Sequence, residues 1–133
     1  MKLFDVIRDI GKSIIIRIKG LLNSIESQFY IGSLLLCVEY FHTNFIIYRD
    51  IKPENIMIDD MGFMKLIDMG TAKFLKGKSG RTYTIIGTPH YMAPEIITGK
   101  GYTYSVDFWS IGVCLYEFMC GGVPYAEDAD DTY

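Results

Sequence analysis

The stretch YRDIKPEN at residues 48–55, followed by DMG at residues 68–70, decides how this chain is interpreted. The first segment carries an acidic residue, a lysine and an amide within six positions, and the second adds another acidic residue. Carboxylate and amide oxygens are suitable ligands for Mg²⁺, and a lysine can neutralise the charge of a phosphate. The two segments therefore predict a site at which a metal-bound triphosphate could be handled.

Two further motifs follow in order, TPHYMAPE at residues 88–95 and DFWSIG at residues 107–112. With them the chain resembles the large lobe of a protein kinase, whose activation loop ends in an "APE" segment above a central helix. More narrowly, the runs IYRDIKPENIMID, KLIDMGTAK, GTPHYMAPEIITGKGY and VCLYEFMCGGVPY resemble the cyclic-GMP-dependent kinases of the serine/threonine group. Tyr48, where many other kinases have His, agrees with that group.

This resemblance assigns a role to each polar residue of the motifs. Asp50 would accept the proton of a substrate hydroxyl or orient it, and Lys52 would neutralise the transferring phosphoryl group. Thr88 would bridge Asp50 and Lys52 through its hydroxyl. Asn55 and Asp68 would bind Mg²⁺ and, together with Lys52, would contact ATP. ATP and Mg²⁺ are thus the expected cofactors.

The activation loop has its own expected control. Met69 stands where the family usually has Phe, and its flexible thioether is expected to fill the same apolar slot. The basic stretch at residues 73–84 leads to Thr84, the candidate phosphosite. A phosphate there would add about −2 charges and would be held by Arg49 and Lys73 through charge-assisted hydrogen bonds. The alternative is a solvated basic loop without modification.

Substrate preference is indicated by two further carboxylates. Glu54 and Glu117 match positions that in related kinases face basic residues ahead of the target Ser or Thr. A buried Glu117 in an apolar run would otherwise be hard to justify, because burying a charge is costly. The expected partners are therefore protein substrates with Ser or Thr near basic residues.

Hydrophobic periodicity predicts a mainly α fold with short β-hairpins, matching an incomplete C-terminal lobe of the kinase fold. The expected helices cover residues 3–10, 25–42 and 105–120, and the expected strands cover residues 45–48, 56–58 and 65–67. The helix at 105–120 is apolar almost all round, as in a helix at the centre of a lobe. Without further helices to cover it, we expect an exposed apolar face and low solubility.

Length predicts a single domain. A complete kinase domain has about 250 residues, whereas this chain has 133. We expect residues 1–133 to form a partial kinase domain, from the hinge-proximal helix through the central helix, with the small lobe and its Gly-rich loop absent. Residues 12–20 would be an insertion of unknown function. The alternative to a working kinase segment is a catalytically inactive remnant, or a binding module that uses the surface of the large lobe.

Composition excludes several classes of protein. Hydrophobic residues make up 50% of the chain and the net charge is −3, with an acidic C-terminal end, which argues against nucleic-acid binding. No apolar run reaches the roughly 18 residues of a membrane span. The three cysteines are odd in number and lack C-x-x-C spacing, which favours reduced, buried thiols and a cytoplasmic location.

Overall fold

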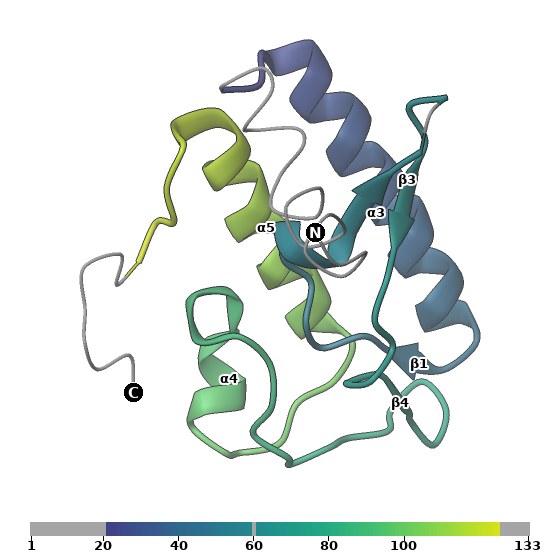
Figure 1. Cartoon of the computed structure of the whole chain (residues 1–133). Helices are drawn as coiled ribbons and strands as arrows, with labels where there is room; N and C mark the ends of the chain where they lie inside the picture. Colours follow the sequence, from purple (N-terminus) through teal and green to yellow (C-terminus); the bar gives the residue numbers. More distant parts are fainter. Residues whose placement is uncertain (1–20, 60, 126–133) are drawn as a thin grey trace, which may run out of the picture.

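The computed structural model describes residues 21–59 and 61–125, and two long helices form its frame (Figure 1). Helices α3 and α5 pack against each other, and the short strands and turns lie around them. In chain order the elements are α3 (Ser24–Thr43), β1 (Ile46–Ile47), the 3₁₀ turn Pro53–Asn55, β2 (Ile56–Ile58), β3 (Met64–Leu66), β4 (Lys73–Phe74), the 3₁₀ turn Pro89–Tyr91, α4 (Pro94–Ile97) and α5 (Ser105–Cys120). The predicted fold, mainly α with short strand pairs, is confirmed.

The ends of both long helices are fixed by local chemistry. The side chain of Asn23 accepts hydrogen bonds from the backbone N–H groups of Ile25 and Glu26, and the Glu26 carboxylate accepts from the Asn23 N–H. This reciprocal capping box satisfies donors that would otherwise have no partner in the first turn. Helix α5 ends at Gly121, whose φ of 86° is a left-handed conformation that glycine adopts without strain. The helices predicted at 25–42 and 105–120 are therefore confirmed.

The strands form two separate antiparallel pairs. Strands β2 and β3 make the predicted hairpin, with Ile56 opposite Leu66. Strand β1 instead pairs with β4, so that Ile46 lies opposite Phe74. This second pair is not a hairpin, and the prediction of a basic loop from residue 73 onward missed strand β4. The pairing is non-local and only two residues long, which is too short for an alternating apolar and polar pattern to predict it.

Buried side chains form two clusters that α5 connects. The larger cluster lies between α3 and α5 and includes Leu34, Val38 and Phe118. The smaller cluster lies around α4 and includes Ile96 together with Val106 from the first turn of α5. Because α5 contributes to both clusters, it supports the whole described structure.

Only one face of α5 is buried. Val106, Ser110 and Cys114 lie on the buried side, whereas four large side chains of the same helix remain exposed. These four are Phe108, Trp109, Tyr116 and Met119. The expectation of an exposed apolar face is therefore confirmed, although the helix is not enclosed on all sides as its sequence alone would indicate.

Two expectations about buried sulfur atoms are wrong. Cys114 is buried and Cys37 is half-buried, but Cys120, at the last position of α5, is exposed. Met69 is also exposed, so its thioether does not fill an apolar slot in this structure. Cys120 is the last residue of α5, and Met69 lies in the loop between β3 and β4.

Some predictions fall on residues that the structure does not describe. The helix expected at 3–10 and the insertion at 12–20 lie outside the described residues, as does most of the acidic C-terminal end. Across residues 21–59 and 61–125, none of the helices combines the length and hydropathy that crossing a bilayer requires.

Candidate active site

Asp50, Lys52 and Thr88 form a closed triangle of polar contacts. Lys52 Nζ donates to Thr88 Oγ1 at 2.7 Å, and Thr88 Oγ1 donates to Asp50 Oδ1 at 2.6 Å. Lys52 Nζ also lies 3.0 Å from Asp50 Oδ2. The bridge expected from Thr88 is therefore present, although Thr88 is 36 residues from Lys52 in the sequence. The triangle thus brings a carboxylate, an ammonium and a hydroxyl into direct contact with one another.

Asn55 completes this group from the 3₁₀ turn that follows Lys52. Its side-chain Nδ2 donates to the Asp50 carbonyl oxygen at 2.8 Å and to Asp50 Oδ2 at 3.0 Å. Both amide hydrogens are used in these bonds, so the remaining oxygen, Oδ1, is the atom able to bind a cation. The same bonds fix the orientation of the Asp50 carboxylate, which is largely buried.

Asp68 lies beside Asn55 because the β2–β3 hairpin brings the two loops together. The Ile67 N–H donates to the Asn55 carbonyl oxygen at 2.9 Å, which places the next residue, Asp68, at the same end of the hairpin. Asp68 has a φ of 62° and is exposed, and its Oδ1 accepts from the Gly70 N–H at 3.0 Å. Its second oxygen is the remaining candidate ligand.

The donor set of this site fits Mg²⁺ only together with a phosphate. Across the described residues, no three His, Cys, Asp or Glu side chains are grouped so that they could hold a metal ion by themselves. One carboxylate from Asp68 and one amide oxygen from Asn55 are nevertheless the kind of partial set that Mg²⁺ uses, since it usually keeps waters and takes its other ligands from substrate phosphates. The residues present therefore fit a metal that arrives with a nucleotide.

A single buried carboxylate, Asp107, holds the backbone of residues 48–55, the predicted catalytic segment, which we call the catalytic loop. Its two oxygens accept from the Tyr48 N–H at 3.0 Å and from the Arg49 N–H at 2.8 Å. His42 Nε2 lies 2.8 Å from the same carboxylate, and Asp107 is fully buried. Asp107 was predicted on the central helix, but this role was not predicted. A charge in the apolar run of α5 was the available signal, because a buried carboxylate requires partners.

The catalytic loop is held in an uncommon backbone conformation. Arg49 has a φ of 73°, which is unfavourable for a bulky residue and is maintained here by the bond from its N–H to Asp107. Gly87 passes directly over it, and a Cβ added to Gly87 would lie 2.7 Å from the Arg49 carbonyl oxygen. Gly87 also has a φ of 124°. This position therefore requires glycine, and it brings the following residue, Thr88, onto Asp50.

The residues expected to hold a phosphate on Thr84 are only partly brought together. Thr84 is exposed, and Lys73 Nζ donates to Thr82 Oγ1 at 3.0 Å, two residues before it. Arg49 Nε donates to the Thr71 carbonyl oxygen at 2.6 Å. Arg49 Nη1 is buried and has no hydrogen-bond partner among the described residues. Arg49 and Lys73 thus bind Thr71 and Thr82, and no described hydrogen bond joins either of them to Thr84.

Glu117 is half-buried rather than fully buried, and it has a partner that the sequence analysis did not foresee. The Tyr91 hydroxyl donates to Glu117 Oε2 at 2.6 Å. Burial raises the pKa of Tyr91, and the hydrogen bond to Glu117 and the charges of Glu117 and Glu54 raise it further. Burial of the Cys114 thiol raises its pKa most, and the charges of Glu117 and Glu54 raise it further. Glu54 and Glu117 therefore both lie close enough to Tyr91 and Cys114 to raise the pKa values of these two groups.

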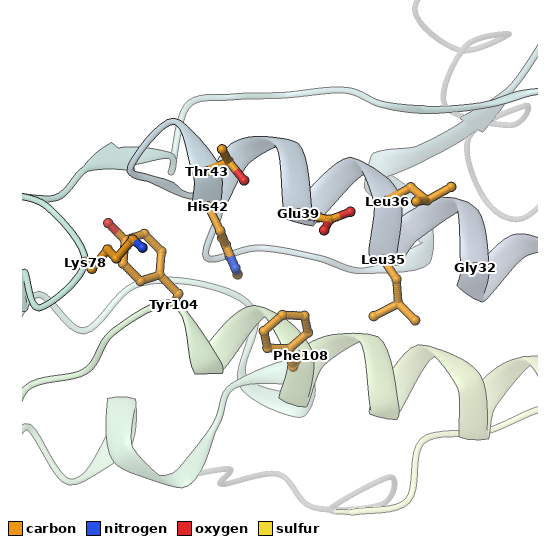
Figure 2. Close-up of a pocket in the computed structure, with 9 residues that line it drawn as sticks. All are labelled: Gly32, Leu35, Leu36, Glu39, His42, Thr43, Lys78, Tyr104 and Phe108. Carbon is orange, nitrogen blue, oxygen red and sulfur yellow. The ribbon is translucent and has the colours of Figure 1, made fainter.

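A groove of about 820 Å³ lies between α3 and the start of α5, away from the catalytic triangle (Figure 2). Figure 2 shows His42 and Leu35 pointing into it toward Phe108 of α5. Its lining residues are Gly32, Leu35, Leu36, Glu39, His42, Thr43, Lys78, Tyr104 and Phe108. The groove holds none of the predicted catalytic residues, so its size does not mark the reaction site.

Comparison with known proteins agrees with the geometry. The family model described as "Protein kinase domain" matches residues 2–133. The chain is 52% identical over 98% of its length to a cGMP-dependent protein kinase of Eimeria tenella, of which it covers 12%. It is 43% identical over 84% of its length to the human cGMP-dependent protein kinase 2, covering 15% of that protein. It is 42% identical over 85% of its length to a mouse cAMP-dependent protein kinase catalytic subunit, covering 31% of it.

Proposed function

The chain belongs to the protein kinase family, and from that premise we propose that it carries the phosphoryl-transfer site of a serine/threonine protein kinase. The observation that supports this most strongly is the triangle of Asp50, Lys52 and Thr88. The chain spans 12–31% of the length of the relatives named above, so the proposal concerns the chemistry of this site.

Each residue of the site has a distinct task. The Asp50 carboxylate receives the proton of the substrate hydroxyl and is kept in place by Asn55 and Thr88. Lys52 uses two of its hydrogens on Thr88 and Asp50, which leaves one to stabilise negative charge on the transferring group. Bound Mg²⁺ with ATP would supply the phosphoryl group and neutralise its charge, held by Asn55 and Asp68.

A transfer assay with labelled ATP and Mg²⁺ tests this proposal. The purified protein is compared with Asp50→Asn and with the control Asp59→Asn, which removes a carboxylate in the turn between β2 and β3. We expect Asp50→Asn to lose at least about 100-fold in rate and the control to keep it. Equal rates for the wild type and Asp50→Asn would refute the assignment. Absence of transfer by the wild-type protein would favour an inactive remnant or a binding module.

We propose further that the substrates carry basic residues ahead of the target Ser or Thr. The two carboxylates Glu54 and Glu117, both near Tyr91, support this, because carboxylates attract Arg or Lys side chains. Replacing the basic residues of a substrate peptide by Ala should raise KM for the wild type but have less effect on Glu54→Gln. Glu39→Gln, an exposed carboxylate on α3, is the matched control. An unchanged preference in Glu54→Gln would contradict the proposal.

We also propose that Thr84 is the activating phosphosite. Its exposure and the unpartnered Arg49 Nη1 among the described residues support this, since a phosphate could satisfy that buried donor. Mass spectrometry of the active protein should find phosphate on Thr84, and Thr84→Ala should lower activity while Thr98→Ala does not. Full activity without phosphate would exclude the role.

A cytoplasmic location is the last part of the proposal. The cysteines at positions 37, 114 and 120 are free thiols, which is typical of a reducing compartment. Fractionation of cells with an antibody against the chain tests it, and recovery from a secreted fraction would contradict it.

A further inference from the structure

Helix α3 has a second apolar face that its own fold does not use. Ile25, Phe29, Leu36 and Tyr40 are 78%, 53%, 68% and 68% exposed. At 100° per residue these four side chains fall within a sector of about 60° on the helix surface. We call this set the α3 stripe. It is a continuous apolar band along most of the helix rather than a few scattered residues.

The stripe lies opposite the face that builds the core. Leu34 and Val38, on the other side of α3, are fully buried in the cluster shared with α5. Leu35 and Leu36 both line the groove between α3 and α5, but Figure 2 shows Leu35 pointing toward Phe108 and the Leu36 side chain pointing away from α5. A helix that is apolar on both sides is expected to be covered on both. The core accounts for one face only.

The stripe is symmetric about the middle of the helix. Ile25 and Tyr40 are equally far from the point between Gly32 and Ser33, and so are Phe29 and Leu36. If a second α3 packs against the first in the antiparallel direction about that point, Ile25 meets Tyr40 of the other copy and Phe29 meets Leu36. A two-fold axis repeats both contacts, as a symmetric dimer requires.

Gly32, halfway along the stripe and just beside its edge, supports the same arrangement. Glycine in the middle of a helix lowers helix stability, so its presence calls for a reason. Its own fold gives none, because an added Cβ at Gly32 would meet no described atom within 4 Å. A small residue at the crossing point lets two helices approach closely. Gly32 also lines the groove between α3 and α5, and the open space beside it is available to a neighbour from outside.

We propose that the α3 stripe is the interface of a symmetric, antiparallel homodimer of this chain. The four exposed side chains present roughly 500 Å² per copy, so pairing covers about 1,000 Å², the low end of specific interfaces. The dimer is accordingly weak, with a dissociation constant of about 1–100 µM. This inference concerns assembly and does not depend on the proposed catalytic function.

Sedimentation velocity of the purified chain at about 1–200 µM, a range that brackets this constant, tests the assembly. We expect the wild type to shift from monomer to dimer, and Gly32→Leu to raise the dissociation constant at least about tenfold. Gly112→Leu is the matched control, since Gly112 is a glycine inside α5 whose added Cβ, like that at Gly32, meets no described atom outside its own helix within 4 Å. Circular dichroism checks that both variants keep the helix content of the wild type.

Cross-linking tests the antiparallel register separately. In a Cys120→Ser background, which removes the exposed thiol, one chain carries Phe29→Cys and a differently tagged chain carries Leu36→Cys. Oxidation of the mixture should give mainly heterodimers between the two tags, because the proposed register places position 29 opposite position 36. Homodimers in each separate preparation would instead indicate parallel pairing.

Three results would overturn the proposal. The first is a wild-type chain that stays monomeric over the whole concentration range. The second is a dimer that Gly32→Leu and Gly112→Leu weaken equally. The third is an oxidised mixture without preference for the 29–36 pair.

Discussion

The hydroxyl of Thr88 is the residue-scale feature on which the proposed chemistry depends most. It is the only group that contacts both Asp50 and Lys52 in the described triangle, donating to one and accepting from the other. Its position depends on Gly87, which has no space for a side chain. The site is therefore assembled by a short segment that is distant in sequence from the catalytic loop.

Replacing Thr88 tests the hydroxyl bridge while leaving the charges of Asp50 and Lys52 in place. Thr88→Val keeps the size of the side chain but removes the bridge, and we expect phosphoryl transfer to fall by about 100-fold, as small misplacements of catalytic groups do. Thr88→Ser keeps the hydroxyl and should stay within about tenfold of the wild type. Steady-state rates and melting temperatures are measured for the wild type and both variants. A Thr88→Val protein with the wild-type rate would show that the bridge is dispensable.

The three thiols should react in the order of their burial. Cys120 is exposed, burial raises the pKa of the half-buried Cys37, and burial raises that of Cys114 well above its usual value. Because the thiolate is the reactive form, a raised pKa lowers reactivity at a given pH. We expect iodoacetamide at neutral pH to modify Cys120 first and Cys114 only in denaturant, as followed by peptide mass spectrometry. Native Cys114 reacting as fast as Cys120 would contradict the described packing.

At the scale of elements, the sequence predicted what local chemistry determines. The helix ends at Asn23 and Gly121 and the β2–β3 hairpin follow from caps, glycine and alternation, and these predictions are confirmed. Strand β4, the partner of Glu117 and the exposure of Cys120 depend on segments far away in the chain, and the sequence analysis missed them. The catalytic triangle was predictable only because the family resemblance supplied Thr88.

Asp107 connects α5 to the catalytic loop, so its replacement should destabilise both elements. Asp107→Ala leaves two buried backbone N–H groups and His42 without their acceptor. We expect the free energy of unfolding to fall by about 3 kcal/mol or more, since each unsatisfied buried group costs about 1–3 kcal/mol.

Urea denaturation measures this loss, and Glu39→Ala, an exposed carboxylate on α3, should change stability by less than about 0.5 kcal/mol. Equal stability of the two variants would mean that water or other groups replace Asp107. An activity loss in Asp107→Ala that exceeds its unfolded fraction would show that the loop has moved.

At the scale of the whole molecule, the exposed apolar face of α5 is expected to limit solubility. Tyr116 and Met119 lie on the exposed face, and we expect low solubility as a result. Tyr116→Glu combined with Met119→Glu should raise the solubility limit in ammonium sulfate without lowering the melting temperature. Met61→Glu combined with Phe63→Glu adds the same charge at the exposed β2–β3 turn and serves as the control. Equal gains would mean that net charge, not the α5 face, limits solubility.

The three bonds to Asp107 also determine when during synthesis the site can form. They join residues that are 58, 59 and 65 positions apart, and the later partner lies on α5 in every case. At roughly 5–20 residues per second, the ribosome makes the catalytic loop about 3–12 s before it makes the carboxylate that anchors it. During that interval the Arg49 N–H lacks its acceptor, Asp107, so the bond that stabilises the left-handed backbone conformation of Arg49 is absent. A nascent chain interrupted before α5 would thus contain the full motif at residues 48–55 but not the backbone conformation that Asp107 stabilises.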